Sequence, residues 1–244
     1  VRRNLDLIKL YGQNYNVYQL NTSYCAFCGR MIEDVEPILL PDRRIICHDC
    51  ANTRVGIDKT MTVLRETRHS LEQSLGITIE MPVRVRYATL SDIRAYQRAH
   101  GIKGEAQEED VVRYGFVIRY AGYGCIETVA DHEVYCIYVE PEMPMLHLVL
   151  TFVHILMDAW THLHAKALDH LGLDEHFMNG LKRWTEIQMM IQMGEVKYAR
   201  RLEIATRSSH DVISRDAVAI FERYPLDYMG RCLSLPFTAF EARV

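Results

Sequence analysis

Apolar residues recur at helical intervals over residues 53–75, and a different pattern follows. The helical spacing predicts an amphipathic helix that ends at Gly76, because glycine commonly terminates helices. Residues 77–90, ITIEMPVRVRYATL, then alternate between apolar and polar side chains. That alternation predicts a half-buried strand in which Pro82 occupies an edge or the start. The apolar positions of the helix are Val55, Met61, Leu64, Leu71 and Leu75.

A short helix and two further strands are predicted next. Residues 91–101 favour a helix with Ser91 as its N-cap. Residues 113–124 and 132–140 are rich in β-branched and aromatic side chains, which is typical of strands. We expect the two strands to flank a loop that contains the glycines Gly122 and Gly124.

Beyond Pro144 the pattern becomes helical and remains so. The longest apolar stretch, residues 145–157, is interrupted by His147 and His154 and is shorter than the ~20 residues that cross a bilayer. We therefore expect no membrane span, and the order of elements predicts an α+β fold. The apolar stripe of the first helix here comprises Leu146, Val149, Leu150, Val153, Met157 and Trp160.

Length and charge constrain the organisation of the chain. Its 244 residues, 49% of them hydrophobic, suffice for one main domain and a small accessory module. We place these at residues 1–54 and 55–244. The formal net charge of −4 and pI near 6.3 provide no global basic field for nucleic acid or membranes. Because the first residue is Val1, we interpret the sequence as a processed chain or a part of a longer one.

Four cysteines form two matching pairs, Cys25-x-x-Cys28 and, after 18 intervening residues, Cys47-x-x-Cys50. Each pair can place two thiolates on one metal ion, so the two pairs complete a tetrahedral zinc site. A site closed by four protein ligands is structural, and we expect it to hold one Zn²⁺ in a double-hairpin unit that offers a surface to a partner. His48 is expected to be exposed and not to be a ligand.

The remaining cysteines, Cys125, Cys136 and Cys232, are scattered along the chain. One tight cluster and three scattered thiols favour a metal site over a disulfide framework. We therefore expect an intracellular reducing compartment, either the cytoplasm or an organelle matrix such as that of mitochondria.

His154 and Asp158 stand one helical turn apart and could share a metal ion. The blander interpretation is that His154, beside the apolar stripe, hydrogen-bonds Asp158. Both interpretations stay open on the residues alone.

The order of segments resembles the LIM-domain metallopeptidases of the plant DA-one organ-size regulator type, a gluzincin-like family. The likeness covers most of residues 20–237 and rests on the cysteine module, the hairpin VYCIYVEPEMP, the helix LTFVHILMDAW, and the later segments LDEHFMNGLKRW and AVAIFERYPLDYMGRCLSLPF. In that family the helix carries an H-E-M-M-H-A-W frame, and the next helix opens near an E-E-G frame that supplies a carboxylate ligand. The resemblance implies a LIM-like or zinc-ribbon-like module followed by a zincin-like domain with a small sheet and a helical C-terminal half.

This chain departs from the family at most of the chemical positions. His154 matches the first ligand, but Ile155 stands at the general base and Asp158 at the second histidine. Loss of the base removes proton transfer worth roughly 10²–10⁴ in rate, and loss of ligands removes the metal. The resemblance thus implies an inactive member with a vestigial metal site at His154 and Asp158. The family's glutamates before Gly180 are replaced by Met178 and Asn179.

We therefore expect a catalytically inactive, metallopeptidase-like protein with one structural zinc ion, acting as a structural or interaction subunit of a larger protein assembly. No small-molecule substrate is expected. One alternative is an active zinc hydrolase that uses His154, Asp158 and a later acid. Another is a zinc-ribbon subunit that contacts RNA in a ribonucleoprotein such as an organellar ribosome, through the basic residues near the N-terminus and in KYARRLEIATR.

Overall fold

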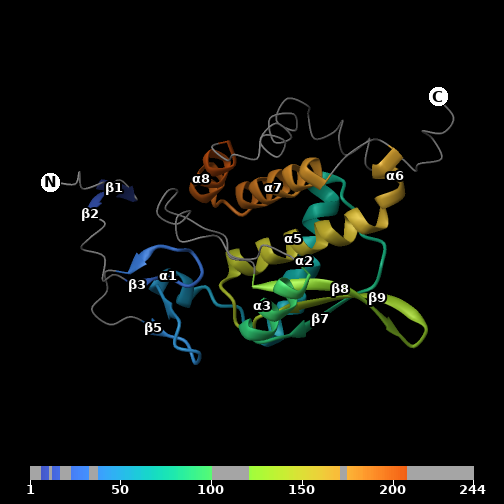
Figure 1. Ribbon diagram of the computed structural model, residues 1–244, viewed down its shortest axis with the longest axis horizontal. Coiled ribbons are helices and arrows are strands. Elements are labelled where there is room, and N and C mark those ends of the chain that lie inside the picture. The colour runs from blue at the N-terminus through green and yellow to red at the C-terminus, as the bar shows by residue number, and fades with distance from the viewer. Residues whose placement is uncertain are drawn as a thin grey trace.

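The computed structural model describes residues 7–10, 13–16, 23–32, 38–100, 121–170 and 175–207. These residues form a mixed α+β structure with small sheets, which confirms the α+β part of the predicted fold class (Figure 1). Strands β1 (Leu7–Leu10) and β2 (Gln13–Asn16) pair as a separate antiparallel ribbon.

The cysteine-rich segment consists of two short antiparallel hairpins and a helix. Strand β3 (Ser23–Tyr24) pairs with β4 (Met31–Ile32), and β5 (Ile38–Leu39) pairs with β6 (Ile45–Ile46). Helix α1 (His48–Asn52) follows. The predicted double-hairpin unit is therefore present.

Helix α2 (Ile57–Leu75) ends where the sequence indicates. Gly76 adopts φ 65°, a left-handed conformation that glycine reaches without a steric penalty, and its N–H bonds the carbonyl of Glu72. The strand predicted over residues 77–90 is shorter, because β7 (Val83–Tyr87) begins immediately after Pro82.

Helix α3 (Leu90–Ala99) has Thr89 as its N-cap, two residues before the predicted one. The Thr89 hydroxyl accepts a hydrogen bond from the Asp92 N–H, and the Asp92 carboxylate accepts one from the Thr89 N–H. This reciprocal pair satisfies two backbone donors at once. Ser91 was the wrong N-cap because the stronger capping pair lies on either side of it.

Among the described residues, the main sheet has three strands in the order β7-β9-β8. Strand β8 (Gly122–Val129) is antiparallel to β9 (His132–Val139), and β7 is parallel to β9. The turn is at Ala130 and Asp131, whose φ angles are 50° and 63°. Residues 113–120, the start of the first predicted strand, lie outside the described residues.

The two glycines expected in the loop lie inside strand β8 instead. A Cβ atom built on Gly124 would stand 2.4 Å from the Tyr135 Oη and 2.6 Å from the Ile155 Cγ2. The prediction was wrong because these glycines permit close approach of neighbouring side chains, which is a common use of glycine in strands.

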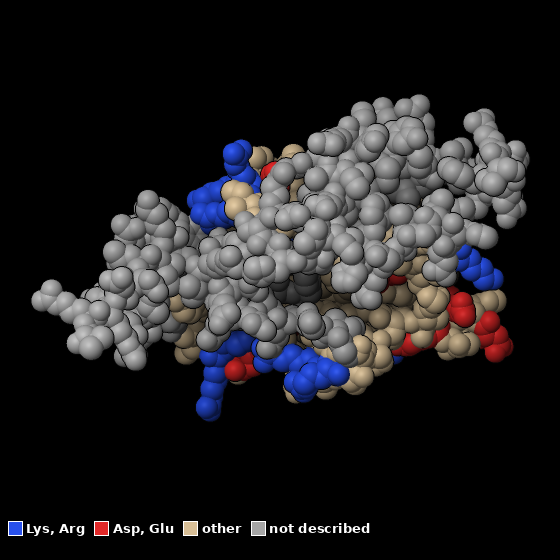
Figure 2. Space-filling model, turned by 45° about the horizontal axis from the view of Figure 1, so that its top comes forward, with Lys and Arg blue, Asp and Glu red and all other residues tan. Residues whose placement is uncertain are grey.

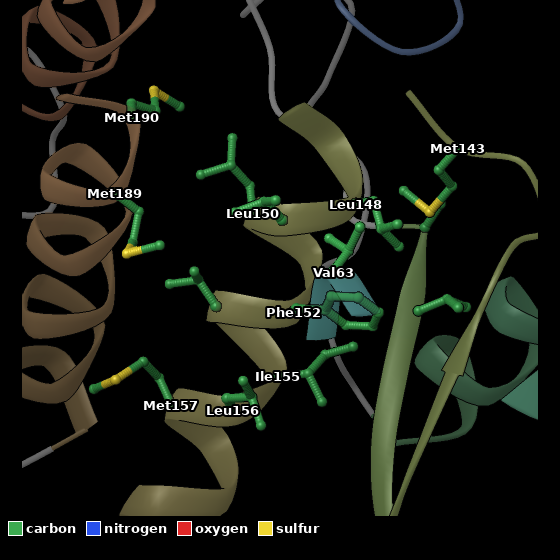
Figure 3. Packing of buried hydrophobic residues seen from close by; sticks show 14 of the residues in the cluster. Val63, Met143, Leu148, Leu150, Phe152, Ile155, Leu156, Met157, Met189 and Met190 are labelled. Carbon is green, nitrogen blue, oxygen red and sulfur yellow. The ribbon is translucent and has the colours of Figure 1, made fainter. Parts of the chain in front are cut away.

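Helix α5 (Met145–Leu163) lies at the centre of the protein and contacts α2, the sheet and α7. Figure 3 shows Met157 directed toward α7, and Phe152 and Ile155 directed toward the strands. Burial on nearly every side explains why α5 is apolar well beyond one stripe. The other helices of the described residues are α6 (Ala165–His170), α7 (Glu175–Gln192) and α8 (Val196–Arg207), the last packed on α7.

Among the described residues, α5 alone has the length and apolar composition of a membrane-spanning helix. Of its most apolar window, 67% is buried inside the protein, as expected for a core helix. Length and composition alone therefore give weak evidence for a membrane location.

Candidate metal centre

The first cysteine pair occupies a tight turn between β3 and β4. The Gly29 N–H donates to the Cys25 carbonyl over 3.0 Å, and the Cys25 N–H donates to the Arg30 carbonyl over 2.8 Å. Gly29 has φ 67°, so a glycine suits the position that closes this turn. The turn places Cys25 and Cys28 on the same side of the hairpin.

The second pair straddles the start of α1. Cys47 is the N-cap residue of this short helix, and Cys50 lies within the helix. The two halves are joined by the Ala26 N–H, which donates to the Ile45 carbonyl over 2.8 Å. This bond holds the first turn against the strand that leads into Cys47.

All four cysteine Sγ atoms lie within 4.8 Å of one another, and all four residues are buried. The Cys28 and Cys47 sulfurs are 3.8 Å apart. A tetrahedral ion with Zn–S bonds of about 2.3 Å would hold its sulfurs about 3.8 Å apart, so the geometry fits one such ion. His48 is exposed and stands outside this group, as expected.

The electrostatics of the cluster are compatible with a bound cation. Hydrogen bonds from Cys28, Cys47 and Cys50 lower the pKa of the Cys25 thiol. Hydrogen bonds with the other three cysteines raise the pKa of Cys50. One thiolate is thus favoured while a neighbour stays protonated, because several adjacent negative charges need a counterion. A bound Zn²⁺ would supply that charge and displace the remaining protons.

The cysteine module is docked on the rest of the protein. The Arg44 guanidinium forms a two-pronged ion pair with the Glu140 carboxylate and lies 5.6 Å from the centre of the Phe27 ring. The Val55 N–H donates to the Met143 carbonyl, and the Met145 N–H donates to the Thr53 carbonyl, each over 2.8 Å. The cysteines belong to the same continuous apolar core as the residues of α5.

The candidate vestigial site, His154 and Asp158, lies on α5 where this helix contacts α7. His154 Nδ1 is 3.1 Å from Glu186 Oε1, and the Asp158 carboxylate is ion-paired with the Lys182 ammonium. The structure therefore gives His154 and Asp158 different partners, both from α7. Within the described part of the chain, the four cysteines are the only group of three or more ligand-type side chains close enough for one ion.

Glu186 was missed by sequence reasoning, although it lies in the core with only 1% of its side chain exposed. Arg183 Nη1 donates to its second oxygen over 2.8 Å. The signal was an acid within the otherwise apolar run WTEIQMMI. The positions matched to the family's glutamates behave differently, since Met178 is buried and Asn179 is exposed.

Comparisons of this chain with protein-family models, with curated protein sequences and with solved structures find no significant match. The resemblance to LIM-domain metallopeptidases consequently stays a prediction.

Proposed function

We propose that this chain is a catalytically inactive, metallopeptidase-like protein that carries one structural zinc ion and serves as a structural or interaction subunit of a larger assembly. The observation that carries the proposal is the pair of cations on α7. Lys182 pairs with Asp158, and Arg183 pairs with Glu186, so protein cations neutralise both of these carboxylates. A divalent ion at these groups would have to displace both side chains.

The residue at the general-base position supports the same proposal. Ile155 is buried, and its side chain fills the space beside Gly122 and Gly124 of strand β8. An apolar side chain cannot take a proton from water, and its neighbours leave little room for a carboxylate. The space between α5 and β8 is occupied by the protein's own side chain.

The interaction role rests on a different part of the surface. A pocket of about 380 Å³ lies between the cysteine module and the main sheet, which is within the size range of ligand and anchor pockets. Its lining is mainly apolar and includes Phe27, Leu40 and Ala88. The apolar runs near residues 145–150 and 187–193, in contrast, are largely buried in the protein's own core, so they supply little apolar surface for a partner.

Charge gives the ribonucleoprotein alternative little support. On the face shown in Figure 2, the visible Lys and Arg side chains of the described residues lie in separate groups. Most of the basic residues near the N-terminus that carry this alternative lie outside the described residues, and the chain as a whole has a formal net charge of −4. We therefore retain protein partners as the proposed contacts.

Metal content and hydrolysis test the catalytic half of the proposal. We expect one zinc per purified chain, none of it retained at this centre after Cys47→Ser, and no chelator-sensitive cleavage of a peptide panel. Cleavage that a chelator abolishes would overturn the proposal, and two zinc ions per chain would favour the hydrolase alternative.

Site-specific photo-crosslinking tests the interaction half. A benzophenone amino acid at Ala88, inside the pocket, should give one recurrent protein adduct in native extract. The same probe at Gln73, exposed on α2, is the matched control and should give none. Equal labelling from both positions would argue against the pocket as a contact site.

A further inference from the structure

Two cysteines outside the metal centre face each other in the main sheet. Cys125 of β8 and Cys136 of β9 are direct partners in the antiparallel register. Such partners have Cα atoms about 4.5–5.5 Å apart. A disulfide spans Cα separations of about 4.4–6.8 Å, so the backbone already holds the two residues at bonding distance.

We propose that Cys125 and Cys136 form a redox-sensitive dithiol that converts reversibly to a cross-strand disulfide. Both cysteines are reduced in the structure. The pair is separate from the zinc ligands and plays no part in the function proposed above.

The two thiols differ in access, which assigns their order of reaction. Cys125 is partly exposed, whereas Cys136 is fully buried. A dissolved oxidant therefore meets Cys125 first. Cys136 then acts as the resolving thiol, because it is placed beside Cys125 and shielded from solvent.

Polar and charged side chains surround the pair and affect how readily each thiol loses its proton. The Cys125 thiol donates to Glu127 Oε1 over 3.9 Å. The Arg86 guanidinium lies 3.0 Å from Glu127 Oε2, and Tyr138 Oη donates to the same carboxylate over 2.5 Å. The Arg86 guanidinium favours the Cys125 thiolate, whose proton passes to solvent because the partly exposed thiol is in reach of water.

The reaction balances with a low-molecular-weight disulfide such as oxidised glutathione as the oxidant. The Cys125 thiolate attacks one glutathione sulfur, the S–S bond breaks, and glutathione thiolate leaves. The Cys136 thiolate then attacks the Cys125 sulfur of the mixed disulfide and releases the second glutathione. Two protein thiols lose two electrons and two protons, and one glutathione disulfide becomes two glutathione thiols.

The test uses the zinc-loaded full chain with Cys232→Ser, which removes the other thiol that is not a predicted ligand. The protein is incubated with oxidised glutathione, quenched in acid, alkylated and mapped by peptide mass spectrometry. We expect one peptide pair linked through Cys125 and Cys136, lost on treatment with dithiothreitol. Absence of this link at every oxidant ratio would overturn the proposal.

Cys136→Ala is the matched variant, because alanine is small and apolar as a buried thiol is. Without a resolving thiol, glutathione should accumulate on Cys125 to a level at least about tenfold above that of the parent, since intramolecular attack normally removes it. Equal glutathione adduct in both proteins would show that Cys136 does not resolve Cys125 and would overturn the mechanism.

Discussion

Glu186 is a carboxylate buried in the core, and a buried carboxylate is stable only when other groups pair with it. His154 and Arg183 contact its two oxygens from different helices. Lys182, which precedes Arg183 in the chain, also forms an ion pair, but its partner Asp158 has 42% of its side chain exposed. Adjacent positions on α7 therefore carry cations in very different surroundings.

Substitution of Arg183 and of Lys182 should lower the free energy of unfolding by different amounts. Arg183→Met should lower the free energy of unfolding by about 2 kcal/mol, somewhat below the cost of breaking a fully buried pair, because Arg183 is itself part-exposed. Lys182→Met should cost less than about 1 kcal/mol, because its carboxylate can be hydrated. Urea denaturation of both variants measures the difference, and equal costs would contradict the burial of Glu186.

The cross-strand thiols give a pH prediction at the same scale. Burial, and then the negative charge of Glu127, raise the pKa of Cys125, while Arg86 opposes the shift. The thiol is therefore protonated at neutral pH, and its thiolate fraction rises about tenfold per pH unit below the pKa. Oxidation by glutathione disulfide should accelerate accordingly from about pH 7 to 9.

Glu127→Gln is the control for that profile, since it removes the charge and keeps the shape. The steep part of the profile should move to lower pH, because one cause of the raised pKa is lost. A rate that does not change with pH would show that thiolate formation does not limit the reaction.

At the scale of elements, α5 and β8 approach so closely that glycine is required between them. Ile155 takes up the space beside Gly124, and only 2% of the residue is exposed. The helix thus presents an apolar contact at the position that the family resemblance assigns to a catalytic glutamate. Its partners across the interface are fixed by the sheet register.

Ile155→Glu should consequently destabilise the protein and leave it without peptidase activity. We expect a loss of at least about 3 kcal/mol in unfolding free energy, because a carboxylate would be buried without a partner. Ile155→Val, the conservative control, should cost about 0.5–1.5 kcal/mol. A glutamate tolerated within about 1 kcal/mol would mean that the side chain can turn to solvent.

Local signals predicted some elements well and could not reveal others. The left-handed end of α2 at Gly76 and the four-cysteine cluster depend on short-range spacing, which the sequence displays directly. The position of Gly124 within β8 depends on Tyr135 and Ile155, which come from other elements. The contact of Glu186 with His154 likewise requires knowing how α7 packs along α5.

At the scale of the whole molecule, the zinc module and the body share one apolar core. The spacing of the cysteines predicts a module that could unfold and leave the remainder intact. Arg44 with Glu140, and Arg30 with Tyr198 of α8, join the module to two separate elements of the body. From these contacts we expect the two parts to stabilise each other.

Zinc removal should therefore weaken the body as well as the module. Both tryptophans, Trp160 and Trp184, lie in α5 and α7, so their fluorescence reports the body alone. Chelation, or Cys47→Ser, should lower the urea midpoint of this signal and keep a single transition. Cys136→Ala, which removes a buried cysteine outside the metal centre, is the control. An unchanged tryptophan midpoint after zinc loss would establish two independent units.

The bridge between the module and the start of α5 also bears on the order of events during synthesis. Arg54 pairs with Glu142 across 88 residues of chain, whereas the four cysteines lie close together in the sequence. A nascent chain can close the short cysteine loops as soon as they leave the ribosome, but the long loop must wait for the second half. Metal capture would then precede docking, and a shortage of zinc would be felt before the body of the protein has been made.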